Sequence, residues 1–111
     1  MTVSVIGAGG VGGYFGGKLA LAMPRVPGLK VAFLARGEHL RAIQRDGLVL
    51  DAQEGVSTCV PSLATDRPEE LPPSALYLIC VKGYDLEGVL SSLRPFIPDG
   101  ASLMPLLNGV D

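Results

Sequence analysis

Short apolar runs alternate along this chain with segments whose apolar residues recur at helical spacing. The apolar runs predict strands at residues 3–6, 29–35, 76–81 and 101–107. Helical patterns follow three of these runs, at about 10–22, 36–46 and 85–93. Strands that alternate with helices are typical of a parallel sheet with right-handed βαβ connections. The pattern therefore predicts an α/β domain in which helices flank a mostly parallel sheet.

Two segments depart from this alternation. Residues 48–50 and 56–60 flank the turn-like stretch 51–55, and together they predict a small β-hairpin inserted into the domain. Gly55 can supply a positive φ in that turn. Residues 61–74 contain four prolines, so we expect a loop that leads into the next strand.

The helix predicted at 10–22 carries extra glycines at positions 13, 16 and 17. Each glycine in a helix interior costs about 0.5–1 kcal/mol relative to alanine. A helix that keeps them uses its bare backbone for close packing or for the approach of a ligand. The alternative is a poorly formed helix that only its neighbours stabilise.

The first strand runs directly into a glycine-rich turn that opens this helix. A strand, a G-x-G-x-x-G turn and a helix, in this order, form the context of a dinucleotide-binding loop. Gly7 allows the tight turn, Gly9 lets a pyrophosphate approach the backbone, and Gly12 lets the helix pack close to the strand. Phosphates favour a helix N-terminus because unpaired N–H groups and the helix dipole attract negative charge. We therefore predict a Rossmann-type fold, with a purely structural glycine turn as the alternative, and the predicted cofactor-binding residues of this loop are Gly7, Ala8, Gly9, Gly10, Val11 and Gly12.

Ligands of parallel α/β sheets bind beyond the carboxyl ends of the strands, and Arg36 follows the second strand. NAD-binding domains usually place an acidic residue there, which holds the ribose 2′-hydroxyl. A guanidinium instead pairs with a 2′-phosphate and stacks on adenine, so Arg36 favours NADP over NAD. We interpret Glu38, two residues later, as a first-turn residue of the next helix rather than as a ligand of the hydroxyl.

Lys82 and Asn108 follow two other predicted strands. Lys82 either projects into solvent or faces an anionic ligand, and its place at a strand end favours the ligand. Asn108 is either a turn residue before Gly109 or an amide that binds a carboxamide or a substrate carbonyl. A convincing general acid for hydride transfer to a ketone is not evident, because no partner is visible that would tune Tyr14, Tyr77 or Tyr84.

Composition narrows the class of protein further. The 111 residues are 48% hydrophobic, lack tryptophan and carry a net charge of −2, with no basic patch that would favour nucleic acid or an anionic membrane. No apolar stretch approaches the roughly 20 residues of a membrane span, and no export signal is evident. Cys59 and Cys80 are interpreted as reduced, buried thiols of a cytoplasmic protein. We expect no metal site, since the single histidine, His39, is interpreted as a surface residue.

Four segments occur in a specific order and spacing: GAGGVGG, LARGEHLRAI, ICVKGYDLEGVL and LLNGVD. Together they closely resemble the N-terminal domain of the ketopantoate reductases (2-dehydropantoate 2-reductases), and the resemblance covers nearly the whole chain. It implies that the loop at 7–12 binds the pyrophosphate of NADP and that Arg36 recognises its 2′-phosphate. It also implies that Lys82 and Asn108 lie near the nicotinamide and the substrate. The family uses NADPH to reduce 2-dehydropantoate to pantoate, a step towards pantothenate and coenzyme A.

Members of the family continue into a helical C-terminal domain, absent from this chain, that supplies the catalytic lysine and a substrate-binding glutamate. We therefore expect residues 1–111 to be an incomplete NADP-binding domain with no catalytic residue of its own. Alone, it should be inactive and bind NADPH weakly, whereas its parent acts on a small 2-oxo acid. Two alternatives stay open: a related 2-oxo acid, 6-phosphogluconate- or opine-type dehydrogenase, and a non-catalytic nucleotide-sensing module. The sequence does not decide whether the protein forms a homodimer.

Overall fold

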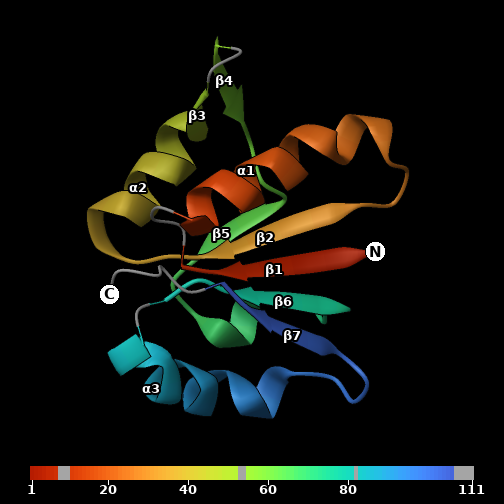
Figure 1. Ribbon diagram of the computed structural model, residues 1–111, viewed down its shortest axis with the longest axis vertical. Coiled ribbons are helices and arrows are strands. Elements are labelled where there is room, and N and C mark those ends of the chain that lie inside the picture. Colours follow the sequence, from red (N-terminus) through yellow and green to blue (C-terminus); the bar gives the residue numbers. More distant parts are fainter. Residues whose placement is uncertain (8–10, 53–54, 82, 107–111) are drawn as a thin grey trace.

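The computed structural model describes residues 1–7, 11–52, 55–81 and 83–106 (Figure 1). Its centre is a five-stranded sheet in the order β5-β2-β1-β6-β7, and every neighbouring pair of strands is parallel. The strands are β1 (Thr2–Ile6), β2 (Lys30–Leu34), β5 (Leu63–Thr65), β6 (Leu76–Ile79) and β7 (Ser102–Pro105). The chain thus builds outward from β1 to one side and then crosses to β6 on the other side.

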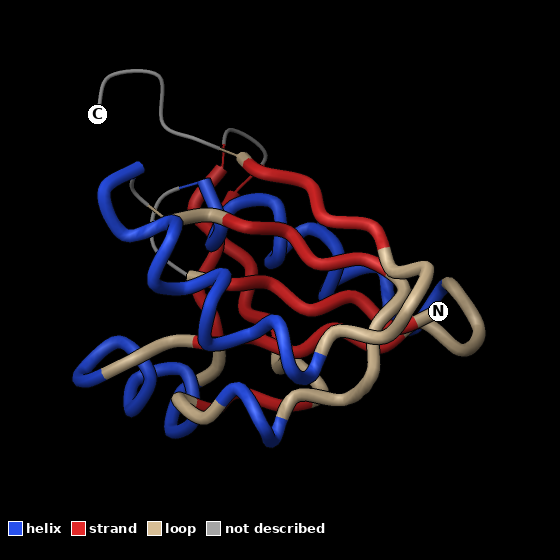
Figure 2. The backbone as a smooth tube through the Cα atoms, turned by 90° about the horizontal axis from the view of Figure 1, so that it is seen from below, coloured by secondary structure: helices blue, strands red, loops and turns tan. Residues whose placement is uncertain are grey.

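Helices cover both faces of this sheet (Figures 1 and 2). The helices α1 (Val11–Ala22) and α2 (Gly37–Asp46) lie on one face, together with a separate antiparallel hairpin of β3 (Leu48–Ala52) and β4 (Gly55–Cys59). The helix α3 (Gly83–Leu93) covers the opposite face. The described residues also form three short 3₁₀ helices: η1 (Met23–Arg25), η2 (Pro68–Glu70) and η3 (Arg94–Phe96). The predicted Rossmann-type architecture with a hairpin insertion is confirmed.

The alternation of side chains along β1 explains why Val3, Val5 and Ile6 are all apolar. Val3 and Val5 belong to the core under α1 and α2, whereas Ile6 belongs to the core under α3. All three are at most 1% exposed. A strand buried on both faces has no solvent side on which polar residues would be favoured.

The prediction of a loop at 61–74 is wrong, because Leu63–Thr65 forms the edge strand β5 beside β2. Backbone bonds extend this pairing at both ends, from the Ser62 amide to the Val31 carbonyl and from the Ala35 amide to the Thr65 carbonyl. A three-residue strand among prolines is too short to show a period of two, so its apolar pattern carried no signal. The strand forms instead because its backbone pairs with that of β2.

Two glycines of α1 account for how closely this helix approaches its neighbours. A Cβ atom at Gly16 would lie 2.6 Å from a ring carbon of Phe33, and one at Gly17 would lie 3.2 Å from side-chain carbons of Leu48 and Leu50. Phe33 is fully buried in β2. This geometry supports the interpretation that the bare backbone serves close packing, against β2 and the hairpin.

None of the helices in the described ranges is long and apolar enough to span a membrane.

Candidate dinucleotide site

The carboxyl ends of β1, β2, β5 and β6 are aligned by backbone hydrogen bonds that continue one residue beyond the strands. The Gly7 amide donates to the Leu34 carbonyl at 2.9 Å, and the Cys80 amide donates to the Ile6 carbonyl at 2.8 Å. The Ala35 amide donates to the edge strand β5 in the same way. The segments that lead into α1, α2 and α3 therefore leave the sheet at the same level, on the edge where α/β sheets bind ligands.

Gly7 is required at its position for two independent reasons. Its φ is +91°, a conformation that side-chain-bearing residues rarely adopt. A Cβ atom there would also lie 2.8 Å from the carbonyl oxygen of Cys80, which directly follows the neighbouring strand β6. The tight turn predicted at Gly7 is thus present.

The rest of the predicted phosphate loop is only partly covered. Ala8, Gly9 and Gly10 lie outside the described residues, so their role towards a pyrophosphate stays a prediction. Val11 and Gly12 belong to the first turn of α1, as the motif requires, and their contact with phosphate also stays a prediction. The helix carries no acidic residue in its first turn, so it offers no carboxylate to compete with an anionic ligand there.

Arg36 immediately precedes α2, in an extended conformation, and its carbonyl accepts a bond from the Leu40 amide at 3.3 Å. Its side chain is exposed, and within the described ranges the guanidinium has no hydrogen bond or ion pair. Glu38 lies in the first turn of α2, as interpreted from the sequence, and its carboxylate pairs with Arg41 at 2.8 Å. Arg36 is therefore available to an anionic ligand, while Glu38 is already paired on the helix surface.

A pocket of about 360 Å³ opens beside Arg36, between the strand ends and α3. Its size is within the range of small-molecule sites. The described residues that line it are mainly apolar, with Arg36 and Asp66 as its two charged groups: Ile6, Gly7, Leu34, Ala35, Arg36, Asp66, Pro68, Val81, Val89 and Ser92. A pocket with mainly apolar walls and a cation in its lining suits a flat ring attached to an anionic group.

Asp66 and Pro68 are site residues that the sequence analysis missed. Both follow β5, and that strand was predicted to be part of a loop. Once β5 is paired with β2, the residues after it must emerge beside Arg36. The sequence did not indicate that β5 pairs with β2, and an Asp-Arg-Pro sequence by itself indicates only a turn.

Lys82 and Asn108 lie outside the described residues, so their contact with cofactor or substrate stays a prediction. Val81, directly before Lys82, lines the pocket. The strand β6, which precedes Lys82, is paired with β1 from Leu76 to Ile79. The elements that would carry these side chains to the site are therefore part of the sheet.

The side chains of Tyr14 and Tyr77 lie in different parts of the fold. Tyr77 is buried, and its hydroxyl oxygen accepts a bond from the Ser74 amide at 3.3 Å. Tyr14 lies on the outer side of α1, where Lys18 approaches its ring to 5.7 Å. Neither residue lines the pocket beside Arg36.

The two thiols are free and protonated at neutral pH. Burial raises the pKa of the Cys80 thiol to about 11 and also raises the pKa of the Cys59 thiol. A thiol with a raised pKa is a poor nucleophile and a poor metal ligand. The part of the chain that the structure describes contains no cluster of acidic residues, histidines and cysteines suited to a metal ion.

Comparisons with known proteins give a consistent result. The sequence model of the family described as "Ketopantoate reductase PanE/ApbA" matches residues 3–111. A 2-dehydropantoate 2-reductase of Mesorhizobium japonicum is 34% identical over 110 residues, which are 99% of this chain and 32% of that protein. The crystal structure of a 2-dehydropantoate 2-reductase from Porphyromonas gingivalis has a TM-score of 0.89 and 39% identity, covering all of this chain and 39% of that one.

A PanE/ApbA family ketopantoate reductase from Ralstonia eutropha has a TM-score of 0.87 and 35% identity, with 99% of this chain and 35% of that one covered. The chain thus spans about a third of the length of the relatives that it matches.

Proposed function

Because the chain belongs to the ketopantoate reductase family, we propose that it forms the NADPH-binding part of a reductase acting on the C2 ketone of 2-dehydropantoate. The family and the Rossmann-type fold imply an oxidoreductase with a nicotinamide nucleotide as cofactor. The choice of NADP, the substrate and the product pantoate, a precursor of pantothenate and coenzyme A, are part of the proposal. So is a cytoplasmic location, in keeping with two free thiols.

The observation that carries the cofactor proposal is the guanidinium of Arg36, which lines the pocket and is unpaired among the described residues. A 2′-phosphate carries a charge of about −1.5 to −2 at neutral pH and accepts hydrogen bonds from a guanidinium in a forked geometry. The apolar walls of the pocket fit adenine. The pyrophosphate would bind at the loop that begins at Gly7, whose positive φ makes the tight turn at the end of β1.

In this proposal the described residues bind and orient the cofactor. Leu34 and Val89 exclude water from the adenine, and Arg36 fixes the ribose end. When bound, NADPH supplies the hydride. Lys82 and Asn108 would hold the nicotinamide end and the substrate carbonyl, so that the reacting atoms are aligned.

The proton that completes the reduction must come from a group beside the substrate carbonyl, and the Tyr77 hydroxyl is instead buried against the Ser74 amide, where β6 begins. We propose that residues outside this chain supply it. The 111 residues alone should then bind NADPH weakly and show no turnover of 2-dehydropantoate. Turnover by this chain alone, at a rate like that of a complete reductase, would overturn this part of the proposal.

Titration of the chain with NADPH and with NADH tests the cofactor proposal. Because the chain lacks tryptophan, binding is best followed by calorimetry or by the fluorescence of the reduced nicotinamide itself. NADPH should bind about tenfold more tightly than NADH, and Arg36→Ala should remove that preference. Arg41→Ala is the matched control, because Arg41 lies on α2, the helix that directly follows Arg36, and already pairs with Glu38. Equal binding of the two nucleotides by the unmodified chain would refute the assignment.

A further inference from the structure

We propose that Arg67 is a second specificity-determining residue, which together with Arg36 holds the ribose 2′-phosphate of the nucleotide between two guanidinium groups. The inference rests on the proposed function and adds to it a residue from a different strand end. The pair is called the arginine clamp below. It would select nucleotides that carry a phosphomonoester on the ribose.

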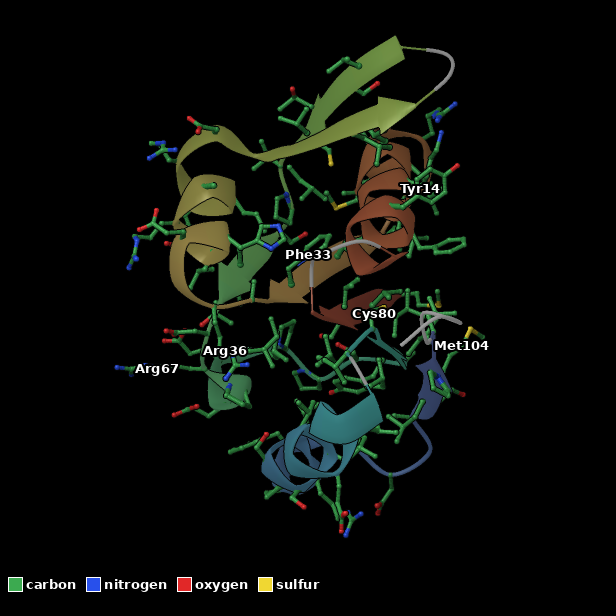
Figure 3. All side chains as sticks on the ribbon, turned by 60° about the vertical axis from the view of Figure 1, so that its left-hand side comes forward. Tyr14, Phe33, Arg36, Arg67, Cys80 and Met104 are labelled. Atoms are coloured by element: carbon green, nitrogen blue, oxygen red, sulfur yellow. The ribbon has the colours of Figure 1, made fainter. Side chains whose placement is uncertain are left out.

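Strand register brings the two arginines to the same place. Leu34 of β2 pairs with Thr65 of β5, and the Ala35 amide continues this ladder by donating to the Thr65 carbonyl at 2.9 Å. Arg36 and Arg67 each follow the last paired residue of their strand by two positions. Parallel strands end at the same edge, so both arginines leave the sheet side by side there (Figure 3).

The backbone of Arg67 is held firmly in this position. Its amide donates to the Thr65 hydroxyl at 3.1 Å, and its carbonyl accepts from the Glu70 amide at 3.0 Å. The Thr65 hydroxyl in turn donates to the Glu70 carboxylate. The residues on either side of Arg67, Asp66 and Pro68, both line the pocket. Arg67 is thus anchored at the rim, and its long side chain is free to turn.

Arg67 differs from two neighbouring arginines in having no ion-pair partner among the described residues. Arg41 and Arg45 form ion pairs with Glu38 and Asp46, at 2.8 and 3.0 Å. Arg67 is exposed, and among the described residues its guanidinium, like that of Arg36, contacts no carboxylate. Figure 3 shows the Arg67 side chain extended outward, so a change of rotamer, without movement of the backbone, would bring it to a bound anion.

The charges around the pocket favour a second cation beside Arg36. Asp66 lines the same pocket as Arg36, and its carboxylate offsets that single positive charge. Glu70 is engaged by Thr65, and Glu69 is an exposed residue of η2. A phosphate with a charge near −2 is therefore attracted to this rim only weakly unless a second cation approaches it. Arg67, directly after Asp66 in the chain, is the cation placed to do so.

The test compares two small probes that differ only in the relevant group, adenosine 2′,5′-bisphosphate and adenosine 5′-monophosphate. Arg67→Ala should weaken binding of the bisphosphate by about five- to tenfold and leave that of the monophosphate within about twofold. Arg67→Lys should retain part of the affinity, because it keeps the charge and loses the fork. The effect of Arg67→Ala should shrink at high salt, since the clamp is exposed.

Arg25→Ala is the control for charge at a distance. Arg25 is exposed and lies in η1, five residues before β2 begins, whereas Arg36 follows the other end of that strand. If Arg36→Ala weakens bisphosphate binding and Arg67→Ala behaves like Arg25→Ala, the clamp is overturned while the proposed function stands. If the unmodified chain does not prefer the bisphosphate over the monophosphate, the proposed function fails, and the clamp fails with it.

Discussion

Replacing Gly16 with alanine tests how closely α1 must approach the sheet. The new Cβ atom would lie 2.6 and 2.7 Å from two ring carbons of Phe33 and 3.1 Å from a methyl carbon of Val5. Optimal contacts between carbon atoms are about 3.5–4.0 Å, so the overlap with the ring is close to 1 Å. Phe33 and Val5 are fully buried, so neither has open space into which it could move.

Two effects of opposite sign determine the result. Alanine in place of a helical glycine gains up to about 1 kcal/mol from helix propensity, whereas overpacking a core costs about 1–3 kcal/mol. Gly88→Ala supplies the propensity term alone, because Gly88 lies in α3 and a Cβ atom there meets nothing within 4 Å. We therefore expect Gly88→Ala to stabilise the domain and Gly16→Ala to be about 1–3 kcal/mol less stable than Gly88→Ala.

The assay is urea unfolding followed by far-ultraviolet circular dichroism, with the free energy of unfolding obtained by linear extrapolation. A second variant, Phe33→Leu, is then combined with Gly16→Ala in a double-mutant cycle. If the ring causes the penalty, Gly16→Ala should cost less in the Phe33→Leu background than in the original protein. Equal stabilisation by Gly16→Ala and Gly88→Ala would contradict the close contact between α1 and β2.

Two further predictions concern the strand ends beneath the proposed cofactor site. Gly7→Ala should lower the free energy of unfolding by about 1–3 kcal/mol and weaken NADPH binding, because of the positive φ and the close carbonyl of Cys80; unchanged stability and affinity would contradict this. The Cys80 thiol, with its pKa raised to about 11, should react slowly with iodoacetamide at pH 8 and faster as the pH rises towards 11. Because the folded state favours the protonated thiol, this contribution to stability is present below about pH 9 and is lost as the pH rises through about 11, and Cys80→Ala should remove that part of the pH dependence.

The sequence predicted the elements whose apolar residues are continuous or regularly spaced. The strands at β1, β2, β6 and β7, the helices and the β3–β4 hairpin all appear near their expected positions. The family resemblance is confirmed by the comparisons. The strands and helices were predictable because burial on one or both faces imposes a local apolar pattern on the sequence.

The strand β5 escaped prediction because its formation depends on β2 rather than on its own residues. That single error concealed Asp66 and Pro68, which line the pocket only because β5 pairs with β2, and with them Arg67, which lies between the two in the chain. Arg36 was predictable because it directly follows a well-marked strand. Side-chain contacts of this kind become visible once the order of strands in the sheet is known.

The backbone bonds that align the strand ends also bear on how the cofactor preference of such a domain could change. The amides of Gly7, Ala35 and Cys80 join the neighbouring strands through main-chain atoms alone. The floor of the site is therefore insensitive to the identity of the exposed side chains around it. Exchange of the arginines at positions 36 and 67 could alter which ribose is accepted while the sheet and its helices stay in place. Natural variation and protein engineering would both be able to use that freedom.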